Sequence, residues 1–385
     1  MTVRERALRT MRFDKPDYVP DFEFGAWIQT LERWQHEGMT GDAEDSYKSL
    51  DRYFHTDLAQ NRGPGLGLGF GVLPHFETKV LEDRGSSLII QDDDGVICEQ
   101  IIEGASIPRY IRFPIETRAD WEKFRDERLD PEAPGRLPDD IEGRIQGCPD
   151  DRNHIVCLDH GSIYGWIRNW MGVENLSLAL YDDIDWVEEM MEHLTQLNLA
   201  VLKRLAAVSN GRLTADSSHW WEDMCYNKGP LLSPRIFAEL MVPRYRRVTD
   251  YKDEVFGTQY HTLDCDGNIH ELVGLWLEGG INVMFPIEVA HTDAYRIRRE
   301  FGDRVAMQGG FNKLALIAGP DAIDAEFKRI DPLINEGGFI PHTDHLVPPD
   351  VSLENYLYYR RRKCKIIGKE WVEPGSTGDE TKETA

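Results

Sequence analysis

Short apolar runs in the second half of the chain are each followed at once by polar residues that could do chemistry. The runs cover residues 155–158, 213–215, 258–260, 281–285, 305–307 and 338–340. The polar groups that follow them cover residues 159–162, 216–223, 261–267, 288–291, 308–310 and 342–345. Their carboxylates and imidazoles suit a hard or borderline divalent metal. The candidate ligands are Glu222, His261, Asp264, Asp266, His342 and His345.

Helices predicted between these runs would bring the polar groups to one place. Apolar residues recur at helical spacing over 187–205, 237–241, 269–277 and 323–334. Asp185 and Glu188 have the spacing of a capping box, and Ser233-Pro234 has the form of an N-cap followed by a proline. Strands that alternate with helices indicate βα units on a parallel sheet. With a further strand expected at 19–24, we predict an α/β fold, a (β/α)8 TIM barrel whose active site lies where the strands end.

The first third and the end of the chain follow other patterns. Residues 87–103 predict a β-hairpin insertion with Asp94-Gly95 as its turn. The glycine-rich run 63–69 predicts a mobile loop over the barrel mouth, with a phosphate-cradling loop as the alternative. The tail after Gly368 is charged and poor in apolar residues. We therefore expect one barrel domain with an N-terminal extension over 1–368, and a disordered acidic tail over 369–385.

Composition disfavours several classes of function. The formal net charge of -24 would repel the phosphates of nucleic acid, and otherwise indicates solubility. The chain has no apolar run of about 18 residues, and its N-terminus lacks the apolar stretch of a signal peptide. We therefore expect a cytoplasmic protein that does not enter a membrane. Six cysteines without a CxxC pair predict that most of the thiols are buried, rather than joined in disulfides.

Motifs spread over residues 1 to about 367 are similar to those of one superfamily. They are, in order, Arg4-Glu5-Arg6-Ala7-Leu8, Lys15-Pro16-Asp17-Tyr18-Val19-Pro20, Trp221-Glu222-Asp223-Met224, Ser233-Pro234 with Pro243-Arg244-Tyr245, Asp266-Gly267-Asn268, Gly309-Gly310-Phe311-Asn312-Lys313, and Pro348-Pro349-Asp350 with Glu354-Asn355-Tyr356. The chain resembles the uroporphyrinogen decarboxylase-like superfamily, in the branch that includes corrinoid-dependent methyltransferases. The resemblance implies a TIM barrel and is less specific for one reaction.

One departure from the family pattern bears on the reaction. The true decarboxylases carry an N-terminal Arg-Gln-Ala-Gly-Arg motif that grips the carboxylates of the substrate. Here residues 22–28 read Phe-Glu-Phe-Gly-Ala-Trp-Ile and offer no cation in its place. A polycarboxylate porphyrinogen would also meet a protein of net charge -24. Porphyrinogen decarboxylation is therefore disfavoured.

A second departure concerns the metal. Methyltransferases of this group bind zinc through a His-x-Cys pair before a glycine and through a distant cysteine. Aligned on the glycine and on a following proline, these ligands become Asp264, Asp266 and His345, and Glu222 is the candidate fourth ligand. Side chains on a strand alternate, so Cys265 would point away from the two aspartates. The resemblance thus implies zinc or another divalent metal, and the alternative is that Asp266 only caps the helix that follows.

We expect from this resemblance a methyltransferase, acting as the demethylase component of a corrinoid system. It would move a methyl group between a small O- or N-methyl compound, which could be aromatic, and a corrinoid (cobalamin) that is free or on a carrier protein. A decarboxylase or lyase acting on a small organic acid is one alternative. A non-catalytic corrinoid- or pterin-binding barrel is another, and assembly as a homodimer stays open.

Residues were assigned to this reaction by their place after the predicted strands. The catalytic candidates are Asp216 and Glu222 as proton donors, with Glu222 also a metal ligand, and His160 and His219 as proton shuttles. The substrate-binding candidates are Trp27, Trp220, Trp221 and Gln308. Large aromatic side chains more often fill a core, which is the alternative for the tryptophans.

Overall fold

The computed structural model describes residues 1–40, 48–61, 63–102, 107–159 and 161–375. The chain forms two compact units. Residues Met1–Arg62 and Pro286–Ala385 make up one of them, which we call the terminal unit. Residues Gly63–Phe285 make up the other, which we call the central unit. No helix in the described ranges is long and apolar enough to cross a membrane.

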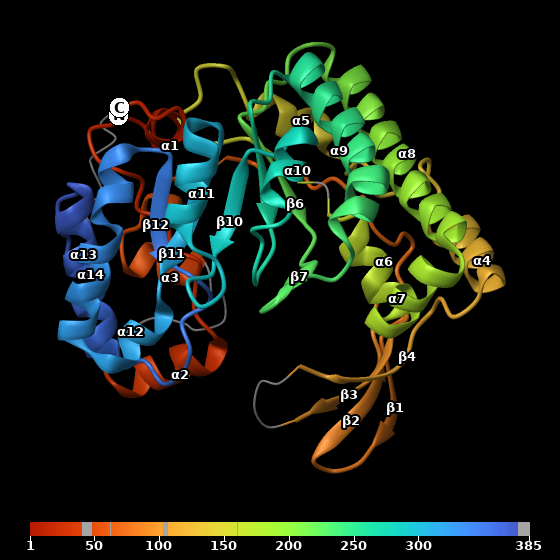
Figure 1. Ribbon diagram of the computed structural model, residues 1–385, viewed down its shortest axis with the longest axis horizontal. Helices are drawn as coiled ribbons and strands as arrows, with labels where there is room; N and C mark the ends of the chain where they lie inside the picture. The colour runs from red at the N-terminus through yellow and green to blue at the C-terminus, as the bar shows by residue number, and fades with distance from the viewer. Residues whose placement is uncertain (41–47, 62, 103–106, 160, 376–385) are drawn as a thin grey trace. The chain divides into compact units, whose positions relative to one another are not determined.

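Parallel strands in the order β10-β9-β6-β5 form the sheet of the central unit. The strands are β5 (Cys157–Asp159), β6 (Ser217–Trp221), β9 (Tyr260–Asp264) and β10 (Val283–Ile287), which ends in the terminal unit. The helices of the central unit are α4 (Arg118–Arg128), α5 (Ile141–Gln146), α6 (Tyr164–Met171), α7 (Val173–Asp182), α8 (Ile184–Ser209), α9 (Pro234–Phe256) and α10 (Val273–Glu278). The long helices α8 and α9 pack side by side (Figure 1).

The two faces of this sheet differ in burial. Alternate residues of a strand point to opposite faces. Leu158, Trp220 and Leu263 point to one face and are completely or almost completely buried. We call this the closed face, and it forms the core of the central unit. The other face, which we call the open face, has four side chains that are accessible at least in part: Asp159, His219, Trp221 and Asp264.

A four-stranded antiparallel sheet also belongs to the central unit. Its strands lie in the order β1-β2-β3-β4. They are β1 (Lys79–Asp83), β2 (Ser87–Gln91), β3 (Ile97–Ile101) and β4 (Arg109–Arg112). In Figure 1 this sheet projects below α7. The predicted hairpin at 87–103 is confirmed as β2 and β3, whose turn is closed by hydrogen bonds from Asp92 N to Val96 O and from Gly95 N to Asp92 O. A short antiparallel pair, β7 (Cys225–Tyr226) and β8 (Gly229–Pro230), follows β6.

In the terminal unit, the parallel strands β11 (Ala306–Phe311) and β12 (Phe339–Thr343) pair with each other. The helices of this unit are α1 (Val3–Met11), α2 (Ile28–His36), α3 (Lys48–Tyr53), α11 (Ala294–Phe301), α12 (Lys313–Ala318), α13 (Pro320–Glu336) and α14 (Leu353–Ile367), with 3-10 turns at Asp57–Gln60 and Gly302–Arg304. The helices α13 and α14 pack side by side (Figure 1). Parallel strands separated by helices confirm the α/β class, and closure into an eight-stranded barrel stays a prediction.

The strand predicted at 19–24 is wrong. In its place the chain is extended, and only Ala26 forms a parallel bridge, to Val347. Pro20 has no N–H to give to a ladder. The side chains that follow it are instead built into an ion network.

That network buries two carboxylates of the terminal unit. Asp21 and Arg360 are inaccessible to solvent and bind each other through two contacts, at 2.7 and 2.6 Å. Lys363 Nζ lies 2.7 Å from Glu23 Oε1. Burial alone would raise the pKa of Asp21, but Arg360 and Lys363 outweigh it and hold that pKa far below its ordinary value.

The residues directly after α14 join the same network. Lys369 Nζ lies 2.7 Å from Asp21 Oδ2 and donates to His55 O at 2.7 Å. Gly375 N donates to Tyr53 O at 3.1 Å. The boundary predicted at residue 368 is therefore wrong, because Lys369 binds residues 369–375 to the terminal unit. The charged composition of this segment had predicted disorder instead. Residues 376–385 lie outside the described ranges.

The predicted strands mostly start too early. The strand expected at 213–215 is Ser217–Trp221, the one at 258–260 is Tyr260–Asp264, and the one at 155–158 is Cys157–Asp159. The residues on the open face are polar, so a strand continues beyond the apolar run that predicted it. Polar residues that were predicted to follow the strands, such as His219 and Asp264, are therefore part of them. Helix limits were closer, since Ser233 caps α9 as predicted, whereas Asp183 rather than Asp185 caps α8.

The glycine-rich run at 63–69 is bound to the rest of the central unit. Arg136 is fully buried, and it donates to the carbonyl oxygens of Gly69 and Gly71, while Gly69 N donates back to Arg136 O. Arg144 Nη1 donates to Gly65 O at 2.8 Å. The carbonyl oxygens of the run thus accept hydrogen bonds from arginines. A phosphate-binding loop would instead point its backbone N–H groups at the ligand, so these contacts disfavour that alternative.

Candidate functional site

The open face of the central sheet brings three titratable side chains together. In the strand register Asp159 lies opposite His219, and Asp264 lies opposite Trp221 on the next strand. His219 Nδ1 is 3.9 Å from Asp159 Oδ1, and His219 Nε2 is 3.7 Å from Asp264 Oδ2. Both distances exceed a direct hydrogen bond, so a water molecule or a polar substrate atom can take part in the link between imidazole and carboxylate.

The two carboxylates raise the pKa of this imidazole. Burial on its own would lower the pKa of His219, but Asp159 and Asp264 outweigh it, and the pKa is raised above its ordinary value. The side chain of His219 is 30% exposed, and that of Asp159 is 75% exposed. His219 is therefore an accessible imidazole whose protonated form is favoured by its surroundings, which suits a general acid.

An aromatic ring and a guanidinium continue the open face beyond the carboxylates. The Arg168 guanidinium lies 5.3 Å from the centre of the Trp221 ring, and Arg168 Nη1 is 3.0 Å from Asp223 Oδ2. Arg168 and Asp223 also line a cavity of about 310 Å³ whose walls include Phe113 and Tyr110. A hollow of this size, next to the carboxyl end of β6, can admit a small molecule.

Glu222 lies at this end of the sheet but is fully buried. Its carboxylate accepts hydrogen bonds from Ser162 Oγ at 2.7 Å, from Ile163 N at 3.0 Å and from Gly165 N at 3.0 Å. These groups surround the start of α6, where unpaired N–H groups and the helix dipole favour a carboxylate. Burial raises the pKa of Glu222 all the same. The carboxylate predicted to donate protons or bind metal thus holds α6 in place.

The prediction that Asp216 shares a pocket with Glu222 is wrong. Because β6 begins at Ser217, Asp216 lies before the strand, at its amino end. At about 3.3 Å a residue, the strand separates the two carboxylates by roughly 20 Å. Asp216 is bound there by Arg152 Nη2 at 2.9 Å and by Val156 N at 2.9 Å.

The two tryptophans of β6 point to opposite faces. Trp220 is fully buried on the closed face, with its ring 5.0 Å from that of Tyr245 and 4.8 Å from Lys252 Nζ. Its predicted contact with substrate is wrong, because the alternation of the strand sends it into the core. Trp221 is the one on the open face. The shuttle candidate His160 lies outside the described residues.

A hydrogen-bonded Ser-His-Asp arrangement occupies the closed face. His261 Nδ1 is 2.6 Å from Ser218 Oγ, and His261 Nε2 is 2.7 Å from Asp253 Oδ1. Ser218 is inaccessible and His261 is 1% exposed. A serine that no substrate can reach is not a nucleophile, so this arrangement joins β6, β9 and α9, and it makes His261 unsuited to bind a metal.

Four candidates, Trp27, Gln308, His342 and His345, belong to the terminal unit. The ring of His345 is 5.4 Å from that of Phe24 and is stacked 6.4 Å from that of Trp27. Gln308 lies on β11 and is partly accessible. His342 is buried and donates through Nδ1 to Thr343 O at 2.7 Å, and burial lowers its pKa to about 4.

The predicted metal ligands divide between the units. Asp264 and Asp266 belong to the central unit, whereas His345 belongs to the terminal unit. Cys265 is 1% exposed and its Sγ accepts from Met224 N at 3.3 Å, and because β9 ends at Asp264, its orientation away from the aspartates stays a prediction. Within the part of the chain that the structure describes, no group of three or more His, Cys, Asp or Glu side chains could hold a metal ion. Two carboxylates and an imidazole are ligand types that suit a divalent ion, but the structure does not bring these three side chains together as a group. The metal site therefore stays a prediction.

Reasoning from the sequence alone did not single out two residues of the candidate site, Asp159 and Arg168. Asp159 was noted only as one of the polar residues after a predicted strand, and Arg168 was not noted at all. The pairing of Asp159 with His219 follows from strand register, which a single sequence does not reveal. The position of Arg168 over Trp221 depends on how α6 packs.

The titratable side chains at the carboxyl ends of the parallel strands lie where α/β folds bind their ligands. Residues 168–360 match the family model described as Uroporphyrinogen decarboxylase (URO-D). The chain belongs to the uroporphyrinogen decarboxylase family, which confirms the resemblance drawn from its motifs.

Two known proteins show how far the likeness extends. A uroporphyrinogen decarboxylase from Vesicomyosocius okutanii subsp. Calyptogena okutanii (strain HA) is 30% identical over 77 residues, which are 20% of this chain and 21% of that relative. This match thus spans about a fifth of the relative. A solved methyltransferase from Methanosarcina mazei is similar in fold, with a TM-score of 0.56 and 14% identity, over 95% of this chain and 99% of that one.

Proposed function

We propose that the protein is a methyltransferase that moves a methyl group between a small O- or N-methyl compound and a corrinoid, free or on a carrier protein. The eight-stranded barrel that the family resemblance implies is part of the same proposal. The observation that carries it is the position of His219 between Asp159 and Asp264 on the accessible face of the sheet.

Demethylation needs a proton at the atom that loses the methyl group. When the bond between the methyl carbon and the oxygen or nitrogen breaks, the electron pair stays on that atom, and an alkoxide or phenoxide is a poor leaving group. A ring N–H of His219 supplies the proton, and Asp159 and Asp264 stabilise the imidazolium until it is given up. A reduced corrinoid, when bound, would supply the nucleophile that takes the methyl group.

Substrate orientation falls to the neighbouring groups. Trp221 offers an aromatic face beside the cavity lined by Arg168 and Asp223. Asp264, Asp266 and His345 remain the residues that would hold zinc or another divalent metal, which would polarise the leaving atom when bound. Every other step of the proposal uses the side chains of the open face.

The terminal unit argues against a polycarboxylate substrate. In the segment where the decarboxylases carry arginines, this chain has Asp21 and Glu23, and their carboxylates take up Arg360 and Lys363. Those two cations are therefore not free to grip a substrate. Decarboxylation of a smaller acid is the second candidate, which the family match favours. His219 would then protonate the carbon that loses carbon dioxide.

One assay separates these functions. The purified protein is mixed with reduced cobalamin and a panel of methyl ethers and methylamines, and methylcobalamin is followed by its absorbance, while carbon dioxide release is measured from small acids. We expect methyl transfer that falls at least about 100-fold in His219→Gln. The exposed His36 on α2 provides the control, and His36→Gln should leave the rate unchanged. Carbon dioxide release without methyl transfer would replace the proposal by the second candidate.

A further inference from the structure

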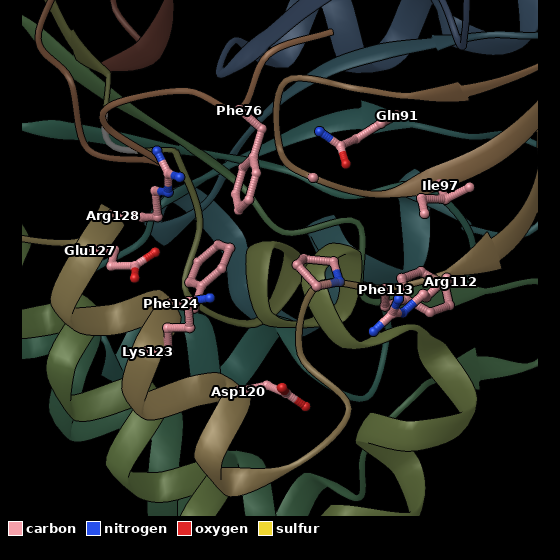
Figure 2. A pocket seen from close by; sticks show the side chains of 12 residues that line it. Phe76, Gln91, Ile97, Arg112, Phe113, Asp120, Lys123, Phe124, Glu127 and Arg128 are labelled. Atoms are coloured by element: carbon pink, nitrogen blue, oxygen red, sulfur yellow. The ribbon is translucent and has the colours of Figure 1, made fainter. Parts of the chain in front are cut away.

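A second hollow in the central unit lies between the antiparallel sheet and α4. It has a volume of about 300 Å³, and Figure 2 shows the side chains that line it. The apolar part of the lining is made of Phe76, Ile97, Phe113, Pro114 and Phe124. Asp159, His219 and Asp264 are not among its lining residues, and Phe113 is the residue that it shares with the cavity beside Arg168.

The aromatic wall of the hollow is well supported. Phe76 and Phe124 are stacked with ring centres 6.1 Å apart, and Phe124 packs in turn on Trp170 at 4.9 Å. Gly95 lets Phe76 lie this close, because a Cβ at that position would be 3.0 Å from the ring. Its φ of +87° also favours glycine. The hollow is therefore a preformed feature, which limits the ordering cost of binding.

Cations surround this wall in a protein that is strongly acidic overall. Arg112 comes from β4, and Lys123 and Arg128 come from α4. Figure 2 shows Lys123 and Arg128 on the side of α4. In a chain of net charge -24, this lining carries three cations against two carboxylates, Asp120 and Glu127.

The lining also holds two carboxylates, and outside it Glu116 Oε1 lies 3.8 Å from Arg112 Nε. Asp120 is committed to the start of α4, where it accepts from Thr117 N at 2.9 Å and from Thr117 Oγ1 at 2.8 Å. Glu127 follows Lys123 by four residues, yet the two are not paired with each other in the described part of the chain. The ammonium group of Lys123 is exposed and makes no ion pair among the described residues.

We propose that this hollow binds a small organic anion with a flat apolar body, of the class of aromatic carboxylates. The ring lies on the wall made by Phe76 and Phe124, and the carboxylate lies toward Lys123 and Arg112. A neutral aromatic amide fills the same space without the charge, and acetate has the charge without the ring. Both halves of the ligand are required, since an exposed ion pair alone contributes little.

Calorimetric titration with benzoate, benzamide and acetate tests this directly. We expect saturable binding of benzoate that is at least about tenfold tighter than binding of benzamide, because a charge-assisted hydrogen bond is lost in the amide. Acetate should not bind measurably. Lys123→Gln should weaken benzoate binding by about the same factor, whereas Lys203→Gln, the same change of charge on the exposed side of α8, should leave it unchanged.

The outcomes that overturn the proposal are equally specific. They are equal affinity for benzoate and benzamide, no saturable binding of benzoate, or unchanged binding in the Lys123→Gln, Arg112→Gln double variant. Both positions are exposed, so the melting temperature of these variants should match that of the unchanged protein and show that they are folded.

Discussion

His219 and His261 lie on neighbouring strands of one sheet and have opposite surroundings. His219 faces the open side, where two carboxylates stand 3.9 and 3.7 Å away and its pKa is raised. His261 faces the closed side, where Ser218 and Asp253 occupy both ring nitrogens and burial lowers its pKa. The residue type is the same, so accessibility and free bonding capacity distinguish a candidate acid from a structural group.

The largest expected effect comes from removing the open-face imidazole. His219→Gln should lower the rate of methyl transfer by about 100-fold or more, because general acid catalysis contributes on that scale. Its melting temperature should change little, since His219 is partly exposed and makes no direct hydrogen bond to either carboxylate. A variant that keeps most of its activity would show that the proton comes from elsewhere.

Removing the closed-face imidazole should do the reverse. His261→Gln breaks hydrogen bonds to Ser218 and Asp253 in a buried position and should lower the free energy of unfolding by about 1–3 kcal/mol. Chemical denaturation measures this loss. Methyl transfer by the fraction that remains folded should be nearly normal. If activity falls as steeply as in His219→Gln, then the distinction between the two faces fails.

The two faces also predict opposite dependences of stability on pH. The pKa of His219 is raised in the folded state, so its contribution is fully present below the unfolded pKa of about 6.5 and is lost as the pH rises through the folded value. The pKa of His261 is lowered, so its contribution is present above about 6.5 and is lost as the pH falls. Denaturation curves of His219→Gln and His261→Gln should therefore differ from the unchanged protein on opposite sides of that pH.

The smallest effect concerns the pair of tryptophans on β6. Trp221→Phe should alter the apparent affinity for substrate and leave stability nearly unchanged, because Trp221 is on the open face. Trp220→Phe should cost about 1–3 kcal/mol of unfolding free energy, since it leaves a cavity beside Tyr245 and Lys252. Steady-state kinetics and chemical denaturation measure the two effects. Loss of stability in Trp221→Phe together with loss of substrate affinity in Trp220→Phe would contradict the assignment of faces.

The sequence supported the architecture better than it supported the site. Helices such as α9 and α13 were predicted because caps and apolar periodicity are local signals. Strand limits were displaced because polar residues on an open face break the apolar pattern. That displacement put Asp216 at the wrong end of β6, and it made Trp220 a substrate-binding candidate although the strand turns it into the core. The proximity of Asp159 to His219 could not be predicted, because it depends on the register of β5 against β6. The role of Lys369 could not be predicted either, because its partner, the buried carboxylate of Asp21, lies far away in the sequence.

The central claim is that the open face raises the pKa of its imidazole, whereas the closed face lowers the pKa of its own. Nuclear magnetic resonance can follow the ring C–H signals of both histidines through a pH titration, with His219→Gln and His261→Gln used to assign them. The account predicts a pKa above 6.5 for His219 and below 6.5 for His261. A pKa for His219 at or below that of His261 would contradict it.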